Sequence, residues 1–515
     1  MGGSARKLAH RLLEVVVAES FDAVVVGAGP NGLAGALVLA AAGLQVVVLE
    51  AEETLGGGAR TLELVSPGYQ HDLCSSVHPM GLASPFFRAF DLARHGVEML
   101  QPEAAYAQPI EGTRAGICWS DLERTVTELG PDGPSWRSLL GPLSQDWRGV
   151  VDTLLSDFRS VPRSPLTTLR FGLRVLDQGT AVWNRRWQTQ EAPAMLSGVS
   201  SHAISPPRSL APAAAGLLLA SLAHAPGIGW PLPRRGSQAI VDAMAAHLRT
   251  LGGELRTGHR VRTLEELPPS RAVLLDVSAR GLLEIAGGRL PTSYAGWLQR
   301  FRFGSGACKV DFALSGPVPW RNEDVRRAGT VHLGGTREDV ARAEQQVHDG
   351  QHPDNPFCIV VQAGVVDDSR APAGHEALWS YAHVPHGSPR DLGDAVEARI
   401  EEFAPGFRDL VLHRSVIPAA EMVGHDANYV GGDIAAGATT PWQMLMRPTP
   451  TWDPYRTPVE GTYLCSASTP PGPGVHGMPG VWAAKRALRQ VFGDRRDPLQ
   501  LVAKSVQGST AGSAA

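Results

Sequence analysis

The apolar positions near the start of the chain form two short runs separated by a glycine-rich turn and a helix-like segment. Residues 22–26 (DAVVV) and 45–49 (QVVVL) are apolar runs of the length of buried strands, and residues 33–42 are rich in Ala and Leu. This order predicts a strand, a helix and a second, parallel strand, which together form one complete βαβ unit.

Further along the chain the pattern changes twice. Residues 112–229 are punctuated by Pro and Gly and carry amphipathic stretches, which predicts a mainly helical insertion. Residues 237–252 predict a helix, and the apolar runs at 256–264 and 271–277 predict two strands. We therefore expect the chain to return to its first domain after the insertion.

The last third of the chain contains alternating apolar and polar positions. In three segments, 307–314, 357–364 and 375–384, the apolar residues recur with the period of half-buried antiparallel strands. We expect these strands to form the floor of a substrate cavity. A strand at 461–467 and a helix at 481–491 flank a loop dense in Gly and Pro. The resulting fold class is α/β, with a Rossmann-like domain and a discontinuous α+β substrate domain.

Composition and charge narrow the function classes. The 515 residues are 43% hydrophobic and 19% charged with a formal net charge of -4, so we expect a folded protein with no nucleic-acid partner. The five cysteines form no Cys-x-x-Cys pair, and no metal site is expected. No apolar run reaches the ~20 residues of a membrane helix, which favours a cytoplasmic protein. An amphipathic first segment, residues 1–20, would allow a peripheral membrane contact.

A dinucleotide-binding motif lies between the first predicted strand and helix. Gly27, Gly29 and Gly32 fit Gly-x-Gly-x-x-Gly: the first allows a tight turn, the second lets backbone approach a pyrophosphate, and the third lets helix and strand pack closely. Pro30 and Asn31 complete the turn. The first helix would direct its N–H groups at the anion.

The second strand ends on an acid that suits an adenosine ribose. Glu50, followed by Ala51, stands at the offset where a carboxylate accepts hydrogen bonds from ribose hydroxyls. The glycine-rich turn that follows contains Gly57, Gly58 and Arg60, and the guanidinium of Arg60 could pair with a pyrophosphate. This turn favours FAD over NAD. The sequence contains no second strand-turn-helix unit with the same glycine pattern, so we do not expect a separate nicotinamide-binding domain.

With these residues, the chain resembles the FAD-dependent superfamily that contains amine oxidases and phytoene desaturases, and most closely its phytoene dehydrogenase-related branch. The resemblance spans residues 21–493. It rests on VVVGAGPNGL and VVVLEAEETLGGGART near the start, PGYQHD soon after, RRGSQAIVDAM in the middle, and TYLCSASTPPGPGVHGMPG near the end.

The resemblance implies further FAD contacts outside the first motif. It places a helix N-terminus beside the flavin at Gly474, Val475, His476 and Gly477, where free N–H groups would stabilise negative charge on the ring. It also implies a contact from Val261. Many relatives carry Gly-Asp after the last strand, and Ser466 stands in that region here.

Three residues are candidates for chemistry beside the flavin. By resemblance, Lys309 occupies the place of the amine oxidases' strand lysine, although a lysine at a strand edge would show the same pattern. His71 and Asp72 could transfer protons near neutral pH, or Asp72 could simply cap a turn. His476 is the best-placed histidine because the flavin-facing motif positions it.

Three functions fit these motifs. The first is removal of hydride from a hydrophobic small molecule, with C–C desaturation of a polyene or isoprenoid-like substrate favoured by the resemblance. The second is C–N oxidation of amines, and the third is a non-catalytic lipid escort of the GDP-dissociation-inhibitor type. The electron acceptor, oxygen or a quinone, and the oligomeric state stay open.

The expected domains are an FAD-binding domain at 21–111, 233–298 and 446–498, a substrate domain at 112–232 and 299–445, and mobile termini at 1–20 and 499–515.

Overall fold

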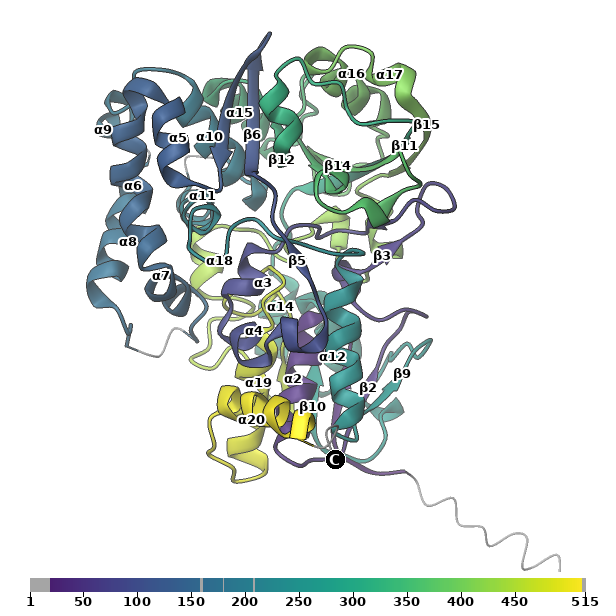
Figure 1. Cartoon of the computed structure of the whole chain (residues 1–515). Coiled ribbons are helices and arrows are strands. Elements are labelled where there is room, and N and C mark those ends of the chain that lie inside the picture. Colours follow the sequence, from purple (N-terminus) through teal and green to yellow (C-terminus); the bar gives the residue numbers. More distant parts are fainter. Residues whose placement is uncertain (1–18, 158–160, 179, 207–208, 512–515) are drawn as a thin grey trace, which may run out of the picture.

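The computed structural model of the protein describes residues 19–511 apart from 158–160, 179 and 207–208. A five-stranded parallel sheet forms one half of the molecule (Figure 1). Neighbouring strands pair in parallel in the order β16-β10-β1-β2-β9. The strands are β1 (Phe21–Val26), β2 (Val46–Leu49), β9 (Glu254–Arg256), β10 (Ser270–Leu275) and β16 (Thr462–Leu464).

Alternate residues of these strands enter two different cores, which explains their continuous apolar sequence. Ala23 and Val25 pack with helices on one face, whereas Val24 and Val26 pack with helices on the other. The first face carries α2 (Pro30–Ala41), α12 (Gln238–Thr250) and α19 (Met478–Val491); the second carries α13 (Ala279–Ala286) and α14 (Thr292–Gln299). The expected Rossmann-like fold is therefore confirmed.

A seven-stranded sheet forms the second half (Figure 1). Its order is β15-β11-β14-β13-β12-β6-β7, and every neighbouring pair is antiparallel except β12 with β6. The expected antiparallel strands are confirmed. The strands are β6 (Ala104–Glu111), β7 (Arg114–Trp119), β11 (Gly306–Leu314), β12 (Ala328–Leu333), β13 (Cys358–Gln362), β14 (Glu376–Val384) and β15 (Val411–Ile417).

Helices cover the two sheets and fill the predicted insertion. Within it, α11 packs against α6, α8 and α10 and has an apolar surface on both its sides. The insertion contains α5 (Leu122–Glu128), α6 (Gly133–Gln145), α7 (Trp147–Leu154), α8 (Pro165–Asp177), α9 (Ala181–Arg185), α10 (Glu191–Ser200) and α11 (Leu210–Ala223). The remaining helices are α3 (Pro79–Ala83), α4 (Pro85–Phe90), α15 (Arg337–His348), α16 (Gly393–Phe403), α17 (Phe407–Leu410), α18 (Pro441–Leu445) and α20 (Pro498–Ala511). Across the part of the chain that is described, no helix has both the length and the hydropathy to cross a bilayer.

Three segments differ from the sequence-based expectation. β6 lies in the seven-stranded sheet, although residues up to 111 were expected in the FAD-binding domain, because it pairs with β12 as well as with β7. Residues 499–511, expected in a mobile terminus, belong to α20, whose Leu501 and Val502 are buried. Residues 1–18 and 512–515 lie outside the described residues.

The third difference concerns the strand expected at 256–264. It ends at Arg256, because the backbone then turns across the end of β2: Gly258 N–H donates to Glu52 O (2.9 Å) and His259 N–H donates to Glu50 O (2.7 Å). Gly258 has a positive φ, which permits that turn. The turn brings Val261 beside the dinucleotide motif.

A buried carboxylate ties the two halves together. Asp72, in the short hairpin β3 (Thr61–Leu62) and β4 (His71–Asp72), accepts hydrogen bonds from Ser76 Oγ (2.6 Å), Thr61 Oγ1 (2.7 Å) and Ser237 N–H (2.9 Å), and pairs with Arg370. Burial by itself raises the pKa of Asp72, but Arg370 and the hydrogen bonds outweigh burial and lower it. This contribution to stability is present at neutral pH and is lost as the pH falls through the lowered pKa.

We expect Arg370→Ala to lower the free energy of unfolding by about 3–5 kcal/mol, because it leaves the Asp72 carboxylate buried and unpaired. Chemical denaturation at neutral pH measures this loss. Arg342→Ala is the matched control, since Arg342 pairs with Asp339 on the exposed surface and should cost less than about 1 kcal/mol. Equal losses for the two variants would contradict the role given to Asp72.

Candidate functional site: a dinucleotide cavity joined to an apolar chamber

The glycine turn brings the start of α2 against the ends of β1 and β10. Gly27 has φ +97°, and a Cβ there would lie 2.9 Å from the carbonyl oxygen of Asp276; a Cβ on Gly32 would collide with the carbonyl oxygen of Gly27. Only glycine fits at these two positions. Gly29, the N-cap residue of α2, has no side chain to cap the helix; Pro30 has no N–H, and the Gly32 N–H donates to Asp276 Oδ2 (2.8 Å).

Glu50 fastens the end of β2 to this turn. Its Oε2 accepts from Ala28 N–H (2.7 Å) and its Oε1 accepts from Glu52 N–H (3.0 Å). A carboxylate has about four acceptor positions, so both oxygens retain lone pairs for ribose hydroxyls. Glu50 is therefore both a structural tie and an acceptor at the cavity wall.

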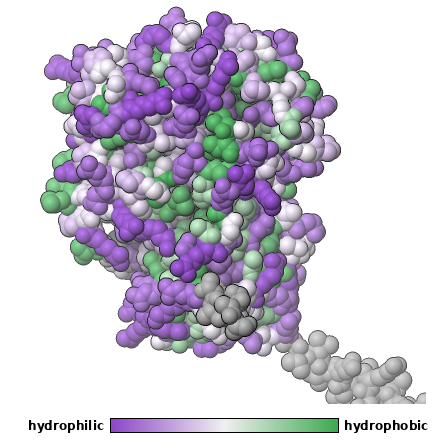
Figure 2. Space-filling view, viewed as in Figure 1, coloured by the Kyte–Doolittle hydropathy of each residue, from purple (hydrophilic) through white to green (hydrophobic). Residues whose placement is uncertain are grey.

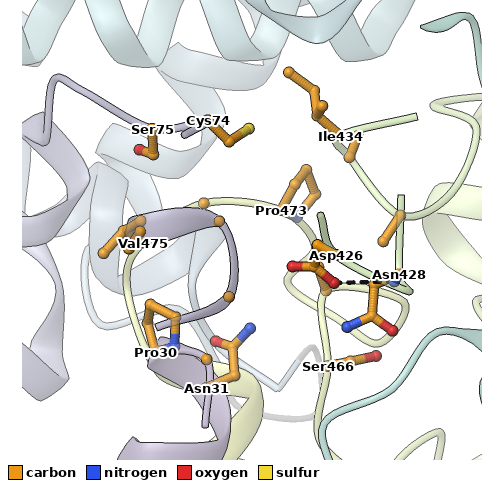
Figure 3. Close-up of a pocket in the computed structure, with 18 of the residues that line it drawn as sticks. Pro30, Asn31, Cys74, Ser75, Asp426, Asn428, Ile434, Ser466, Pro473 and Val475 are labelled. Atoms are coloured by element: carbon orange, nitrogen blue, oxygen red, sulfur yellow. Dashed lines mark hydrogen bonds between the residues drawn. The ribbon is translucent and has the colours of Figure 1, made fainter. Parts of the chain in front are cut away.

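A cavity of about 870 Å³ begins at the glycine turn and extends past the C-terminal loop. In Figure 3, Pro30 and Asn31 from the glycine turn, Cys74 and Ser75, and Ser466, Pro473 and Val475 from the C-terminal segment surround one space. The predicted cofactor residues on its wall are Gly27, Gly29, Pro30, Asn31, Glu50, Ala51, Gly57, Gly58, Arg60, Val261, Ser466, Gly474 and Val475. Gly32, His476 and Gly477 are not wall residues.

Two polar groups at this end of the cavity suit a ligand that carries both hydrogen-bond donors and negative charge. Asn31 Oδ1 is buried without a hydrogen-bond partner. Arg60 is buried and donates to three neutral oxygens, Gly57 O (2.9 Å), Thr54 Oγ1 (3.4 Å) and His425 O. Among the described residues no carboxylate forms an ion pair with it, so its charge is available to a pyrophosphate.

The C-terminal loop presents backbone to the cavity. Gly474 has φ +129°, and Gly477, the N-cap of α19, has φ +71°. His476 is buried behind the wall: its Nδ1 accepts from Met478 N–H (3.3 Å), and its carbonyl accepts from Ser84 Oγ (2.6 Å). Burial lowers the pKa of His476 to about 4, so the ring is neutral and caps α19.

Lys309 and His71 lie together in a buried group beside the cavity. Lys309 Nζ pairs with Asp311 and lies 4.8 Å from the centre of the Trp379 ring. Burial lowers the pKa of Lys309, although Asp311 opposes the shift. His71 Nε2 is 3.0 Å from Phe312 O, and burial lowers its pKa as well.

Neither Lys309 nor His71 is a wall residue of the large cavity. A small cleft lined by Lys309 is also lined by Cys74, Tyr381 and Ile434, and these three side chains line the large cavity. One layer of side chains therefore separates Lys309 from the larger space, and no described contact brings His476 to this group. The catalytic roles of Lys309, His71 and His476 stay predictions.

Sequence reasoning missed Asp276, Asp426 and Asn428, which all line the cavity. Asp276 follows β10, and its Oδ2 accepts from Gly32 N–H (2.8 Å) at the start of α2. Burial raises the pKa of Asp276 to about 8, and the carboxylates of Asp426 and Glu50 add to the shift. A signal existed, because an acid directly after a buried parallel strand lies at the edge where ligands bind.

The other end of the cavity is apolar. Its floor comes from the seven-stranded sheet, and its roof comes from α11. The aromatic residues Trp379, Tyr381 and Tyr429 are wall residues, whereas Trp442 is exposed. The floor includes Ile359, Val361, Trp379 and Tyr381, and the roof includes Ala211, Ala214, Ala215, Leu218 and Leu219.

A pair of histidines supplies polarity to the apolar end. His202 is a wall residue, and its Nε2 lies 2.9 Å from Nε2 of the buried His332. Burial lowers the pKa of His202 to about 3 and also lowers the pKa of His332, so both rings are neutral. One ring must donate and the other accept, which leaves the cavity face of His202 as an uncharged hydrogen-bonding group.

Comparison with known proteins agrees with this geometry. Residues 31–282 match the family model described as flavin containing amine oxidoreductase. The chain is 23% identical to the rat "Pyridine nucleotide-disulfide oxidoreductase domain-containing protein 2", over 92% of this chain and 94% of the rat protein.

Two solved structures share the fold. An oxidoreductase from Methanosarcina mazei is 17% identical with a TM-score of 0.55, covering 92% of this chain and all of its own. A putrescine oxidase bound to putrescine is 17% identical with a TM-score of 0.52, covering 96% of this chain and 99% of its own. The protein is a flavin-dependent oxidoreductase with FAD as its cofactor. Residues 31–282, just under half of the chain, are thus similar to the flavin containing amine oxidoreductases, and the chain shares its fold with both solved structures.

We expect Gly32→Ala to weaken FAD binding roughly tenfold or more, because the new methyl collides with the turn at Gly27. Titration of FAD into cofactor-stripped protein, followed by flavin fluorescence, measures the change. Gly296→Ala in α14 is the control, since its Cβ would meet no atom within 4 Å. Unchanged affinity in Gly32→Ala would remove the glycine turn from the FAD site.

The pKa of Asp276 predicts a pH dependence of FAD affinity. Below about pH 8 the carboxyl is mostly protonated, and above it the ionised group repels a pyrophosphate at the start of α2. FAD affinity should therefore fall several-fold between pH 7 and pH 9. The same titration repeated across this range should show a flat profile for Asp276→Asn; parallel profiles for the two proteins would contradict this role.

Proposed function

We propose that the protein oxidises a hydrophobic small molecule by hydride removal, with C–C desaturation of a polyene or isoprenoid-like substrate as the favoured reaction. The observation that carries the proposal is the continuity of one cavity from the glycine turn and C-terminal loop to an apolar chamber. Bound FAD supplies the acceptor for the hydride and its two electrons. The protein's own task is to hold the reacting carbon against that acceptor.

The distribution of charge along the wall favours an apolar substrate. All acidic wall residues of the described cavity, Glu50, Glu52, Asp276, Glu284 and Asp426, lie at or beside the dinucleotide end. The floor and roof of the chamber, as far as described, offer no carboxylate to a protonated amine, and burying an unpaired charge is costly. An apolar chain instead gains from leaving water for these aliphatic and aromatic walls.

The chamber leaves room for one uncharged polar group on the substrate. His202, held by His332, can donate to or accept from a hydroxyl or carbonyl oxygen without a charge being buried. Aromatic residues Trp379 and Tyr381 lie edge to face, with ring centres 5.1 Å apart, and form a rigid floor between this histidine and the neighbourhood of Lys309. Such a floor would restrict the orientation of a flat, conjugated substrate.

Amine oxidation is the second candidate. It is supported by the buried Lys309 on β11 and by the fold shared with a protein named putrescine oxidase. Pairing of Lys309 with Asp311 leaves that lysine engaged within the protein. A lipid escort without redox chemistry is the third reading, and retention of both FAD segments speaks against it.

The three functions are separated by anaerobic spectroscopy of the FAD-loaded protein. Bleaching of the flavin band by apolar polyenes and not by amines would support the proposal, whereas bleaching by amines alone would replace it with C–N oxidation. Reoxidation with oxygen or a quinone then identifies the acceptor. No bleaching by any organic substrate would contradict both oxidase readings, and bleaching by NADPH would instead indicate a reductase.

We expect Ala215→Phe to block the chamber, because Ala215 lies on its roof and the added ring would project into the space that the substrate needs. Its rate of flavin reduction by the polyene identified above should fall at least about tenfold, with FAD content unchanged. Ala398→Phe on the exposed side of α16 is the control and should keep the full rate. A normal rate in Ala215→Phe would place the substrate elsewhere.

A further inference from the structure

A stripe of leucines on α8 faces solvent. Leu166, Leu169, Leu173 and Leu176 are between 57% and 80% exposed, although leucine ordinarily avoids such exposure in a group. Their spacing of three, four and three residues puts them on one side of the helix. Val161, just before α8, and Val182, in α9, are also exposed, and the six residues together are called the leucine face.

The opposite side of α8 fixes this face beside the apolar chamber. Thr167 and Phe171 are buried, and α8 packs against α7 and against α11, the roof of the chamber. Gln178 Nε2, just after α8, donates to Ala213 O of α11 (3.0 Å). Figure 2 shows hydrophobic side chains along the left edge of the molecule, where Figure 1 places α8 and α9. The leucine face is thus a fixed surface, one helix away from the cavity.

The charge of the same segment is strongly positive. Residues 161–187 contain five arginines and a single acidic residue, although the whole chain has a net charge of -4. The acid, Asp177, pairs with Arg186, so it does not offset the others. Arg163, Arg170 and Arg185 are exposed on the segments that carry the leucine face.

We propose that the leucine face docks on the surface of an anionic lipid bilayer. Leucine and valine side chains would enter the boundary between headgroups and acyl chains, while the arginines would contact headgroup phosphates. The positive charge is the argument for this occupant, because pairing the face with a second copy would bring two sets of arginines together. Docking does not depend on the redox reaction, but it would place the chamber next to a reservoir of apolar molecules.

Two lines of measurement test the surface without turnover. The FAD-loaded protein is sedimented with vesicles of phosphatidylcholine alone and of phosphatidylcholine mixed with phosphatidylserine. We expect binding to the mixed vesicles at least about tenfold tighter than to the neutral ones, and weaker binding as salt is raised. Equal binding to both vesicles, or to neither, would overturn the proposal.

Matched variants localise the contact. Leu169→Gln with Leu173→Gln should reduce binding to the mixed vesicles about tenfold or more, and Arg170→Gln with Arg185→Gln should remove the preference for anionic lipid. Val365→Gln with Leu412→Gln, which removes two exposed apolar side chains elsewhere, should leave binding unchanged. Equal losses in the control would overturn the assignment to α8.

The state of the protein without lipid completes the test. Analytical ultracentrifugation of the unmodified protein should show no concentration-dependent association through the leucine face. An association that is lost in the variant with Leu169→Gln and Leu173→Gln is the result to look for. Such an association would assign the leucine face to a second copy and overturn the bilayer proposal. Flavin absorbance and reduction by a detergent-dispersed substrate should be the same in all variants, so failure of docking stays distinguishable from failure of the proposed reaction.

Discussion

The close approach of α2 to the carboxyl ends of β1 and β10 is the constraint on which the site depends. Gly27 and Gly32 have no room for a side chain, so the backbone of the turn can lie directly against the strand ends. That contact fixes the direction of α2, and α2 in turn packs against α12 and α19. Moving the turn by the size of one methyl would therefore disturb the cofactor end and the helix that carries the C-terminal loop.

The cofactor end could largely be predicted from sequence because its signals are local. The glycine turn, the acid after β2 and the arginine turn are each marked by residues that are close together in the sequence, and all of these residues except Gly32 border the cavity as expected. Asp276 and Asp426 were missed, since their proximity to the turn depends on strand order and loop packing. His476 shows the limit of a motif: its position was predicted, but its ring points into the protein to cap α19.

The substrate end was less predictable because it is made by distant segments. The alternating strands were recognised, yet β6 joined their sheet through a parallel pairing with β12 that no local pattern indicates. Likewise, Lys309 was singled out as a lone lysine, and only the fold shows that Asp311 and Trp379 surround it. The histidine pair, with partners 130 positions apart in the chain, had no sequence signal at all.

The position of β16 at the edge of the parallel sheet has a consequence for how the protein is made. This three-residue strand pairs only with β10 among the described strands, and it delivers the loop that closes the cavity. Contacts between residues so distant in sequence slow folding, because the loop between them must first be closed. During synthesis, nearly the whole chain must leave the ribosome before that loop exists, so the cofactor can be enclosed only at the last stage. Until then β10 is the edge of the parallel sheet and the cavity lacks part of its wall, and transiently exposed strand edges and apolar surface of this kind favour aggregation.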